Sequence, residues 1–222
     1  MGGYDPSMGA DDLQAYLDLV DWRRRVGDVY RAARDGGVEA FRRERDRLFR
    51  EHPQSPIPAA DRRSFRGLDY FAPSPAARFE CDVEPPLTAA DIEIDTGGPD
   101  GTIHYRRAGL VRFQHKGADC MLTIFSIGGY GGGLFMPFRD GTSGNETYGG
   151  GRYLCDTIKN TDSGGLQVSA GSRRVILDFD YAYNPSCAYD HRWACPLAPH
   201  ENWLPVPMAA GEKMYRGKEV IS

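Results

Sequence analysis

The sequence lacks the features of a membrane or secreted protein. No apolar run approaches the roughly 20 residues that a membrane helix needs, and the longest candidate, Cys120–Tyr130, ends in glycines. The first residues, MGGYDPSMGADD, have neither the basic start nor the apolar core of a secretory signal. Pro6 breaks the myristoylation pattern. We therefore expect a cytoplasmic protein with no membrane partner.

Cysteine is scarce and odd in number. The five cysteines are Cys81, Cys120, Cys155, Cys187 and Cys195, and in a chain expected to be intracellular this favours reduced thiols over a disulfide framework. The net charge of −4 argues against general nucleic-acid binding. What the chain does have is 222 residues, 41% of them hydrophobic, which is enough for one domain with a real core.

The first quarter of the chain is predicted to be helical. Apolar residues within 10–34 recur mostly at steps of three and four, and Gly36-Gly37 ends this helix. A second helix follows, until the three prolines of His52–Pro58 end the helical part. We expect residues 1–58 to pack on a β-domain of residues 59–222, because neither part would bury enough surface alone.

Arginine is concentrated in this helical segment, where ten arginines and six acidic residues lie between Asp21 and Arg50. One interpretation is a binding face for an anionic partner. The other is a solvated helix surface whose charges pair at a spacing of four, as Glu39 and Arg43 would. Acidic residues interleave the arginines, and no array of aromatic and basic residues follows. The pattern therefore favours the solvated surface.

The chain after Pro58 is predicted to be mainly β. Turn signals at Gly97–Gly101 and Gly128–Gly133 separate short runs with no helices between them, which favours an antiparallel sheet curled into a barrel. We expect a closed or nearly closed barrel, with a split barrel of the flavin-binding kind and a lipocalin-like barrel as alternatives. The proline-rich chain from Asn184 on is expected to be irregular and to wrap the barrel. The expected strands lie in residues 78–84, 92–94, 103–107, 110–115, 120–127, 134–138, 148–155 and 174–183.

A glycine-rich segment, Phe138–Tyr153, is the first candidate site. It places two arginines, two acids, three Ser or Thr hydroxyls and two tyrosines around five glycines. Glycine lets a backbone approach a ligand, and the arginine fork suits a carboxylate or phosphate. The alternative is a hairpin turn with capping hydroxyls and ordinary ion pairs. The motif of neither a nucleotide nor a dinucleotide site is present, so no cofactor is indicated. The candidate ligand-binding residues here are Arg139, Asp140, Thr142, Ser143, Thr147, Tyr148, Arg152 and Tyr153.

The second candidate site is the thiol segment Asn184–Pro196, which directly follows the strongest predicted strand. Three interpretations stay open. The two cysteines, with His191 and His200, offer four zinc ligands, although the seven-residue gap between the cysteines is unusual for zinc. Cys187 would be a nucleophile if a base or cation lowered its pKa. Both thiols would otherwise be small buried hydrophobic residues. The candidate catalytic residues are Cys187, Tyr189 and Asn184, and no metal ligand is assigned.

The stretch after this segment, Pro199–Pro207, adds one more candidate. Asn202 is included among the ligand-binding candidates. Together with Glu201 it is also predicted to tie the C-terminal chain back through backbone hydrogen bonds.

Four stretches resemble the domain-of-unknown-function family 1684 of bacteria and archaea: Arg50–Pro58, Phe65–Phe71, Phe138–Leu154 and Leu177–Lys213. The Asn-Pro-x-Cys-Ala-Tyr string, the second cysteine followed by proline and the closing Ala-Gly-Glu-Lys make the resemblance specific. It runs from about Asp21 to Lys213, and His200 and Cys155 depart from the pattern. It implies no activity. The resemblance implies that the following residues fall on recurrent motif positions: Arg139, Asp140, Thr142, Ser143, Gly144, Thr147, Tyr148, Gly151, Arg152, Tyr153, Asn184, Cys187, Tyr189, Cys195 and Asn202.

Two functions follow as hypotheses. In the first, a small anionic molecule binds in a polar pocket at one end of the barrel, held by Arg139 and Arg152, with Cys187 as a reactive or recognition centre. In the second, the chain is a non-enzymatic structural or interaction protein with a cysteine-rich clasp, with or without zinc. The first depends on the glycine-rich and thiol segments meeting in space.

Overall fold

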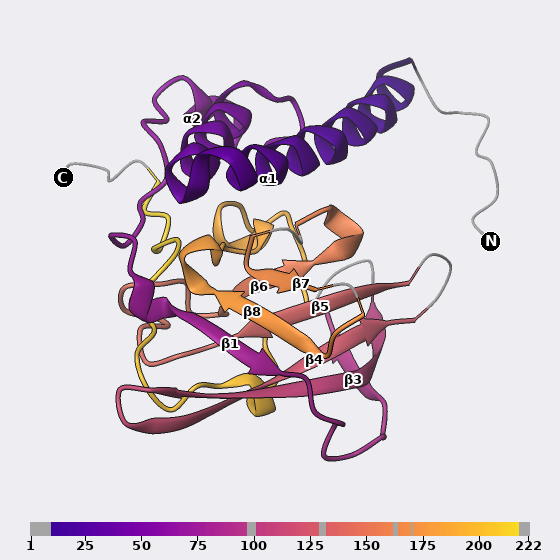
Figure 1. Ribbon diagram of the computed structural model, residues 1–222. Coiled ribbons are helices and arrows are strands. Elements are labelled where there is room, and N and C mark those ends of the chain that lie inside the picture. The colour runs from indigo at the N-terminus through magenta and orange to yellow at the C-terminus, as the bar shows by residue number, and fades with distance from the viewer. Residues whose placement is uncertain (1–9, 97–100, 129–131, 162–163, 170, 218–222) are drawn as a thin grey trace.

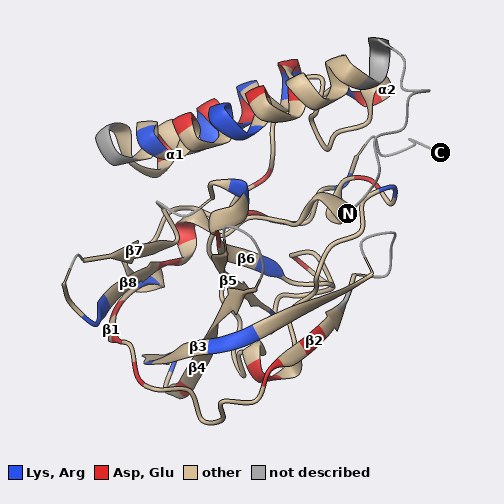
Figure 2. Ribbon diagram, turned by 90° about the vertical axis from the view of Figure 1, so that its right-hand side faces the viewer, with Lys and Arg blue, Asp and Glu red and all other residues tan. Residues whose placement is uncertain are grey.

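The computed structural model describes residues 10–96, 101–128, 132–161, 164–169 and 171–217 (Figure 1). Most of the turn expected at Gly97–Gly101 and the middle of Gly128–Gly133 lie outside these residues. Within them, a helical pair lies over one end of two antiparallel β-sheets, as both ribbon views show (Figures 1 and 2). The predicted mainly β fold with an N-terminal helical pair is confirmed.

The helical pair is α1 (Ala10–Glu51), which folds back on itself at Gly37. Its backbone there, at φ 66° and ψ −165°, is open only to glycine without strain. The two halves run antiparallel, since Tyr30 packs on Phe41 at 5.0 Å and Trp22 on His52 at 5.3 Å between ring centroids. A single turn, α2 (Ala59–Arg62), follows the prolines.

Replacing Gly37 by alanine is therefore expected to lower the free energy of unfolding by about 1–3 kcal/mol, because a Cβ is strained in this conformation. The matched control is Gly128→Ala, at a glycine without positive φ and with open space around it. Urea denaturation of the two variants measures the difference. Equal stability of the two variants would contradict the conclusion that α1 needs a glycine at position 37 to fold back on itself.

The strands form two separate ladders. One sheet has the order β1-β8-β7 and the other β2-β3-β4-β5-β6, with every pair antiparallel. A bulge between Arg107 and Gly109 lets the two runs expected at 103–107 and 110–115 join into one long strand. The bounds are β1 (Arg78–Asp82), β2 (Ile92–Asp95), β3 (Thr102–His115), β4 (Ala118–Ile127), β5 (Gly133–Phe138), β6 (Arg152–Asp156), β7 (Leu166–Val168) and β8 (Arg174–Asp178).

Among the described residues the strands form two separate sheets, and the expected closed barrel is not found. The two sheets face each other across a shared core, in which the ring centroids of Phe79 in β1 and Phe113 in β3 are 4.5 Å apart. Between the ladders, Glu84 and Leu110 exchange one pair of backbone hydrogen bonds, of 2.9 and 3.0 Å. The local alternation of residues could not reveal this arrangement, because β1 pairs with β8, far along the chain.

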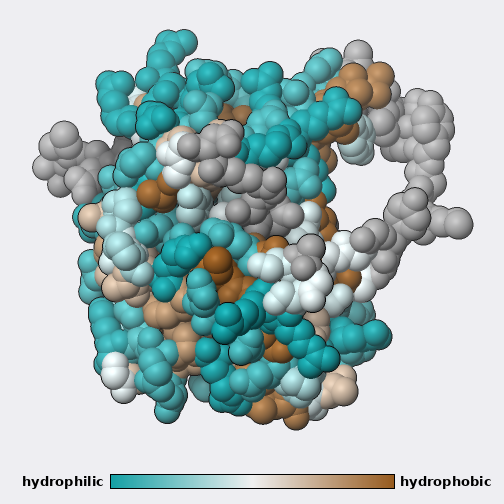
Figure 3. Space-filling model, viewed as in Figure 1, coloured by the Kyte–Doolittle hydropathy of each residue, from teal (hydrophilic) through white to brown (hydrophobic). Residues whose placement is uncertain are grey.

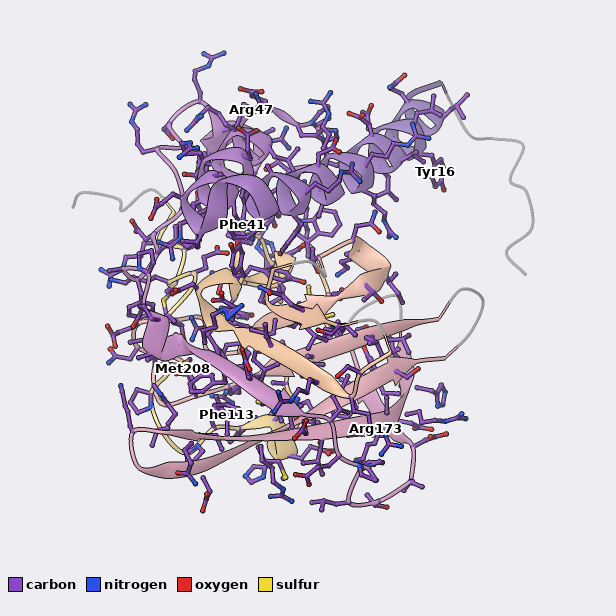
Figure 4. All side chains as sticks on the ribbon, in the orientation of Figure 1. Tyr16, Phe41, Arg47, Phe113, Arg173 and Met208 are labelled. Atoms are coloured by element: carbon purple, nitrogen blue, oxygen red, sulfur yellow. The ribbon has the colours of Figure 1, made fainter. Side chains whose placement is uncertain are left out.

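α1 is buried on the sheets only along part of its length. The ring centroids of Phe41 and Tyr181 are 5.1 Å apart. The Phe41 side chain points toward the sheets, whereas that of Arg47 points away from them (Figure 4). The first turns project past the body, so Leu13, Leu17 and Val20 are exposed, although they belong to the apolar residues whose spacing predicts this helix. Apolar surface is visible there in Figure 3. No described helix is long and apolar enough to cross a membrane.

The chain after β8 is irregular, with 3-10 turns at Phe179–Tyr181, Ser186–Ala188 and His200–Asn202. Backbone hydrogen bonds attach it to distant parts of the fold. The amide of Leu204 donates to the carbonyl of Arg139 (2.8 Å), and that of Lys213 donates to Asp69 (2.8 Å). This path brings the glycine-rich segment and the thiol segment next to the C-terminal chain.

Candidate functional site

Arg152, the first residue of β6, is fully buried and holds the C-terminal chain. Its Nη2 donates to Asp140 Oδ2 and to the carbonyl of Met208, both at 2.9 Å. Its Nη1 donates to the carbonyls of Ala210 and Glu212. Burial lowers the pKa of Arg152, and the charge of Asp140 opposes that shift. These four hydrogen bonds all go to groups of the protein, so the Arg152 guanidinium is used inside the fold and is not free to bind a ligand.

Four other polar residues of the glycine-rich turn, Asp140, Thr142, Ser143 and Thr147, bond within the protein. Asp140 Oδ1 accepts from the amide and hydroxyl of Thr142 and from the amide of Met208. The Thr142 hydroxyl bonds that of Thr147 at 2.8 Å, and the Ser143 hydroxyl accepts from the amide of Asp140. For these side chains the geometry matches the hairpin interpretation, in which hydroxyls cap the turn.

A second buried cluster surrounds Glu212, a carboxylate that sequence reasoning did not select. Its Oε2 accepts from Arg45 Nη2 at 3.0 Å and from the backbone amide of Asn184. Its Oε1 accepts from the side-chain Nδ2 of Asn184 and from the Tyr189 hydroxyl. The candidates Asn184 and Tyr189 are therefore engaged with Glu212. The only signal for Glu212 was its place in the Ala-Gly-Glu-Lys string.

Arg45 comes from α1, in the segment interpreted as a solvated surface. That interpretation is wrong for Arg42 and Arg45, which are buried, while Arg25 and Arg47 are exposed and paired within the helix. Burial alone would lower the pKa of Arg45, but interactions with Tyr189 and Glu212 raise it above its usual range. The expected Glu39–Arg43 pair is not among the ion pairs of the described residues.

The Asn202 side chain ties the C-terminal chain to the larger sheet. Its Oδ1 accepts from the amide of Thr123 at 2.8 Å, and its Nδ2 donates to the carbonyls of Thr123 (3.0 Å) and Pro137 (2.7 Å). Glu201 beside it pairs with Arg107 at 2.6 Å and accepts from the Thr123 hydroxyl. Asn202 is fully buried and its polar atoms face the strands.

Replacing Asn202 by leucine is expected to lower the free energy of unfolding by about 2–4 kcal/mol, because several buried backbone groups lose their partner. Asn145→Leu, at an exposed position of the glycine-rich turn, is the control. Guanidinium denaturation measures both variants. A loss below about 1 kcal/mol for Asn202→Leu would show that the backbone groups find other partners.

Cys187 and Cys195 each shift the pKa of the other thiol, and neither is in a disulfide. Cys187 is half-buried and Cys195 is buried. The hydrogen bond from Cys187 is the main cause that lowers the pKa of Cys195 to about 6, against the opposing effect of burial. The amides of Ser186 and Cys187 and the charge of Lys159 contribute to the same shift.

The glycine-rich segment reaches this pair through Tyr148, whose hydroxyl donates to the Cys187 sulfur at 3.6 Å. Two adjacent glycines pack against the side chains of Tyr148 and Arg139. A Cβ at Gly150 would lie 2.5 Å from the Tyr148 ring, and one at Gly151 would lie 2.8 Å from Cγ of Arg139. We call the set of residues Arg139, Tyr148, Cys187 and Cys195 the thiol site.

Arg139 differs from Arg152 in how its guanidinium is used. It lies over the Trp203 ring, 4.3 Å from the ring centre, and is half-buried. Within the described part of the chain, its side chain makes no hydrogen bond or ion pair. Tyr153, another candidate, is buried and donates to the carbonyl of Pro196, which fixes the chain after Cys195.

The proposed zinc ligands do not gather. The His191 side chain is fully exposed, with Nδ1 3.9 Å from Asp190, and the ring of His200 lies 4.7 Å from that of Trp203. Across the described residues no group of three or more His, Cys, Asp or Glu side chains is placed to hold a metal ion. This geometry gives the zinc form of the clasp no support.

Grooves lined by described residues lie elsewhere. One of about 500 Å³ runs between the two halves of α1 and is lined by charged side chains of both signs, among them Asp21, Arg24 and Glu51. A second, of about 220 Å³, lies at Phe65 and Tyr215. Neither contains a residue of the thiol site.

The fold and buried motif residues define a small β-protein with two facing antiparallel sheets and an N-terminal helical pair. Residues 63–213 match the sequence profile of DUF1684, described as a protein of unknown function, and the chain belongs to this family. An uncharacterised protein of Haloarcula marismortui, solved by NMR, is 37% identical, with 81% of this chain and 93% of that chain covered and a TM-score of 0.58. No curated protein matches.

Proposed function

We propose that the protein binds a small anionic molecule at the thiol site, with Arg139 holding the anionic group and Cys187 as the reactive group. The observation that carries this proposal is the guanidinium of Arg139, which is half-buried over Trp203 and has no hydrogen-bond or ion-pair partner in the described part of the chain. Its donors are therefore open to a carboxylate or phosphate.

The stacking on Trp203 supports this role. An arginine held over an indole ring loses part of its hydration and most of its rotational freedom. A fixed and partly dry guanidinium binds an oxyanion more strongly than a mobile surface arginine does, because less ordering is needed on binding. Tyr148 and Cys187, which contact each other at 3.6 Å, would bind the rest of the ligand.

In this proposal the remaining candidates are supporting residues. Asp140, Thr142, Ser143 and Thr147 shape the turn that carries Tyr148, and the buried bonds of Arg152 keep the turn against the C-terminal chain. The proposal therefore keeps Arg139 as the anion-binding arginine and no longer gives this role to Arg152. Asn184 and Tyr189 hold the thiol segment through Glu212.

The test is a fluorescence titration. Phosphate, succinate and benzoate are added to the wild type at constant ionic strength, and the total tryptophan emission, to which Trp203 beside Arg139 contributes, reports binding. Arg139→Met is expected to weaken binding by about ten-fold or more, the equivalent of one charge-assisted hydrogen bond. The control is Arg106→Met, an exposed arginine on β3. No saturable change with any of the three anions, or equal binding by both variants, would overturn the proposal.

A second candidate function is a non-enzymatic structural or interaction protein. It is favoured by one observation, which is that Arg152, Asp140, Asn202 and Glu212 all direct their polar atoms into the protein. If the motif residues have only this structural role, Arg139→Met will leave the fluorescence response to all three anions unchanged.

A further inference from the structure

We propose that the first turns of α1 are a docking surface for a second copy of this chain, and that two copies pair there with their helices antiparallel. Ten large apolar side chains are exposed in the described part of the chain, and five of them lie within residues 13–20. Four of these five recur at steps of three and four residues, so they line one side of the helix. We call these four residues the apolar stripe: Leu13, Tyr16, Leu17 and Val20.

The apolar stripe is not an extension of the face that α1 buries against its own second half. At about 100° per residue, the stripe lies roughly 150° around the helix from Val26, Val29 and Ala33. Those three residues pack in the cluster shared by the two halves of α1. The turns that carry the stripe project past the sheets, and Tyr16 lies on the projecting part (Figures 1 and 4). A longer second half of α1 would therefore leave the stripe exposed.

Apolar surface continues from the stripe onto the β-sheet part of the molecule. Nη1 of Arg23, one turn after Val20, donates to the carbonyl of Ile158 at 3.0 Å. Ile158 belongs to the 3-10 turn Thr157–Lys159, and its side chain is 37% exposed. A second helix that lies along the stripe therefore ends beside a further apolar side chain.

The charges along α1 favour a second copy as the occupant. Residues 10–22 contain four aspartates and no basic residue, and Arg23, Arg24 and Arg25 follow directly. Two such helices side by side in antiparallel orientation place the acidic part of each copy along the arginines of the other, whereas parallel helices place equal charges together. The stripe fits this orientation, because Leu17 of each copy then packs on Val20 of the other. Two-fold symmetry makes each contact occur twice.

The same aspartates argue against a lipid surface as the occupant, because anionic headgroups attract basic helices and repel acidic ones. The pairing surface is small. Three helical turns bury less than the total of about 1,600 Å² that is typical of a stable complex. We therefore expect a reversible dimer with a dissociation constant in roughly the micromolar range.

The experiment is sedimentation equilibrium of the full chain under reducing conditions, with protein from about 1 to about 300 μM so that the expected dissociation constant is spanned. The wild type is expected to pass from monomer to dimer over this range. Leu17→Glu should raise the dissociation constant about a hundred-fold, because two buried leucines are lost from each dimer. The control is Val168→Glu on β7, where the replaced side chain is 63% exposed, and it should dimerise as the wild type does. Circular dichroism checks that both variants fold.

A charge reversal tests the antiparallel orientation. Arg24→Glu should raise the dissociation constant about ten-fold, because it replaces two attractions to the acidic part of the partner by two repulsions. For the same reason, the wild-type dimer should weaken as the salt concentration rises. The proposal fails if the wild type stays monomeric at every concentration, if Leu17→Glu dimerises normally, or if Arg24→Glu leaves the dimer unchanged. Binding to phosphatidylserine vesicles by a chain that remains monomeric would assign the stripe to a membrane instead.

Discussion

Replacing Arg152 by methionine is expected to lower the free energy of unfolding by about 3–5 kcal/mol, because it leaves a buried charge on Asp140 without its partner. Asp140 and Arg152 are both fully buried at the side-chain level and lie 2.9 Å apart. The same change also removes the donor from the carbonyls of Met208, Ala210 and Glu212. These groups come from the C-terminal chain, so we expect this chain to loosen first.

The matched control for this prediction is Arg139→Met, thirteen positions earlier in the same segment. Arg139 is half-buried, and its guanidinium stacks on Trp203 without a hydrogen bond or ion pair to the described residues, so its loss should change the stability by about 1 kcal/mol or less. Denaturation in guanidinium chloride measures both variants. A similar small effect for both would show that Arg152 does not hold the C-terminal chain.

Replacing Glu212 by glutamine is expected to destabilise the fold by a similar amount, about 3–5 kcal/mol, since it leaves the buried charge of Arg45 unpaired. The two side chains are 7% and 1% exposed, so water cannot replace the lost partner. The substitution also disturbs the bonds from Asn184 and Tyr189. The control is Glu146→Gln, whose side chain is exposed.

A double-mutant cycle tests whether the effect comes from the ion pair. Arg45→Met combined with Glu212→Gln should cost less than the sum of the single substitutions, because removing both charges removes the unpaired one. Additive effects would show that Glu212 acts through Asn184 and Tyr189 alone. Urea denaturation with circular dichroism measures all members of the cycle.

These two clusters explain what the motif residues do. Arg152 and Glu212 connect the glycine-rich turn, the thiol segment and α1 to one irregular C-terminal chain. The chain has no strand among the described residues after β8, so side-chain bonds replace a backbone ladder there. The thiol site lies where these segments meet, and Tyr148 and Cys187 touch across it at 3.6 Å.

The local sequence pattern was sufficient to predict the helices and most of the strands. Helical spacing and Gly36-Gly37 predicted two helices, and alternation predicted most strands, because both signals act between neighbouring residues. The expected strand at 148–155 starts only at Arg152, since Tyr148 and the glycines after it form a turn. β7 was missed because three residues carry too little alternation.

The sequence by itself determined the family, the helical pair and the mainly β character of this protein, since motif strings and periodicity are written in consecutive residues. Only the tertiary structure decided that the strands form two sheets, because β1 pairs with β8 far along the chain. It also decided which arginine is internal. Arg139 and Arg152 are the same residue type in the same segment, and only the distant carbonyls around Arg152 distinguish them.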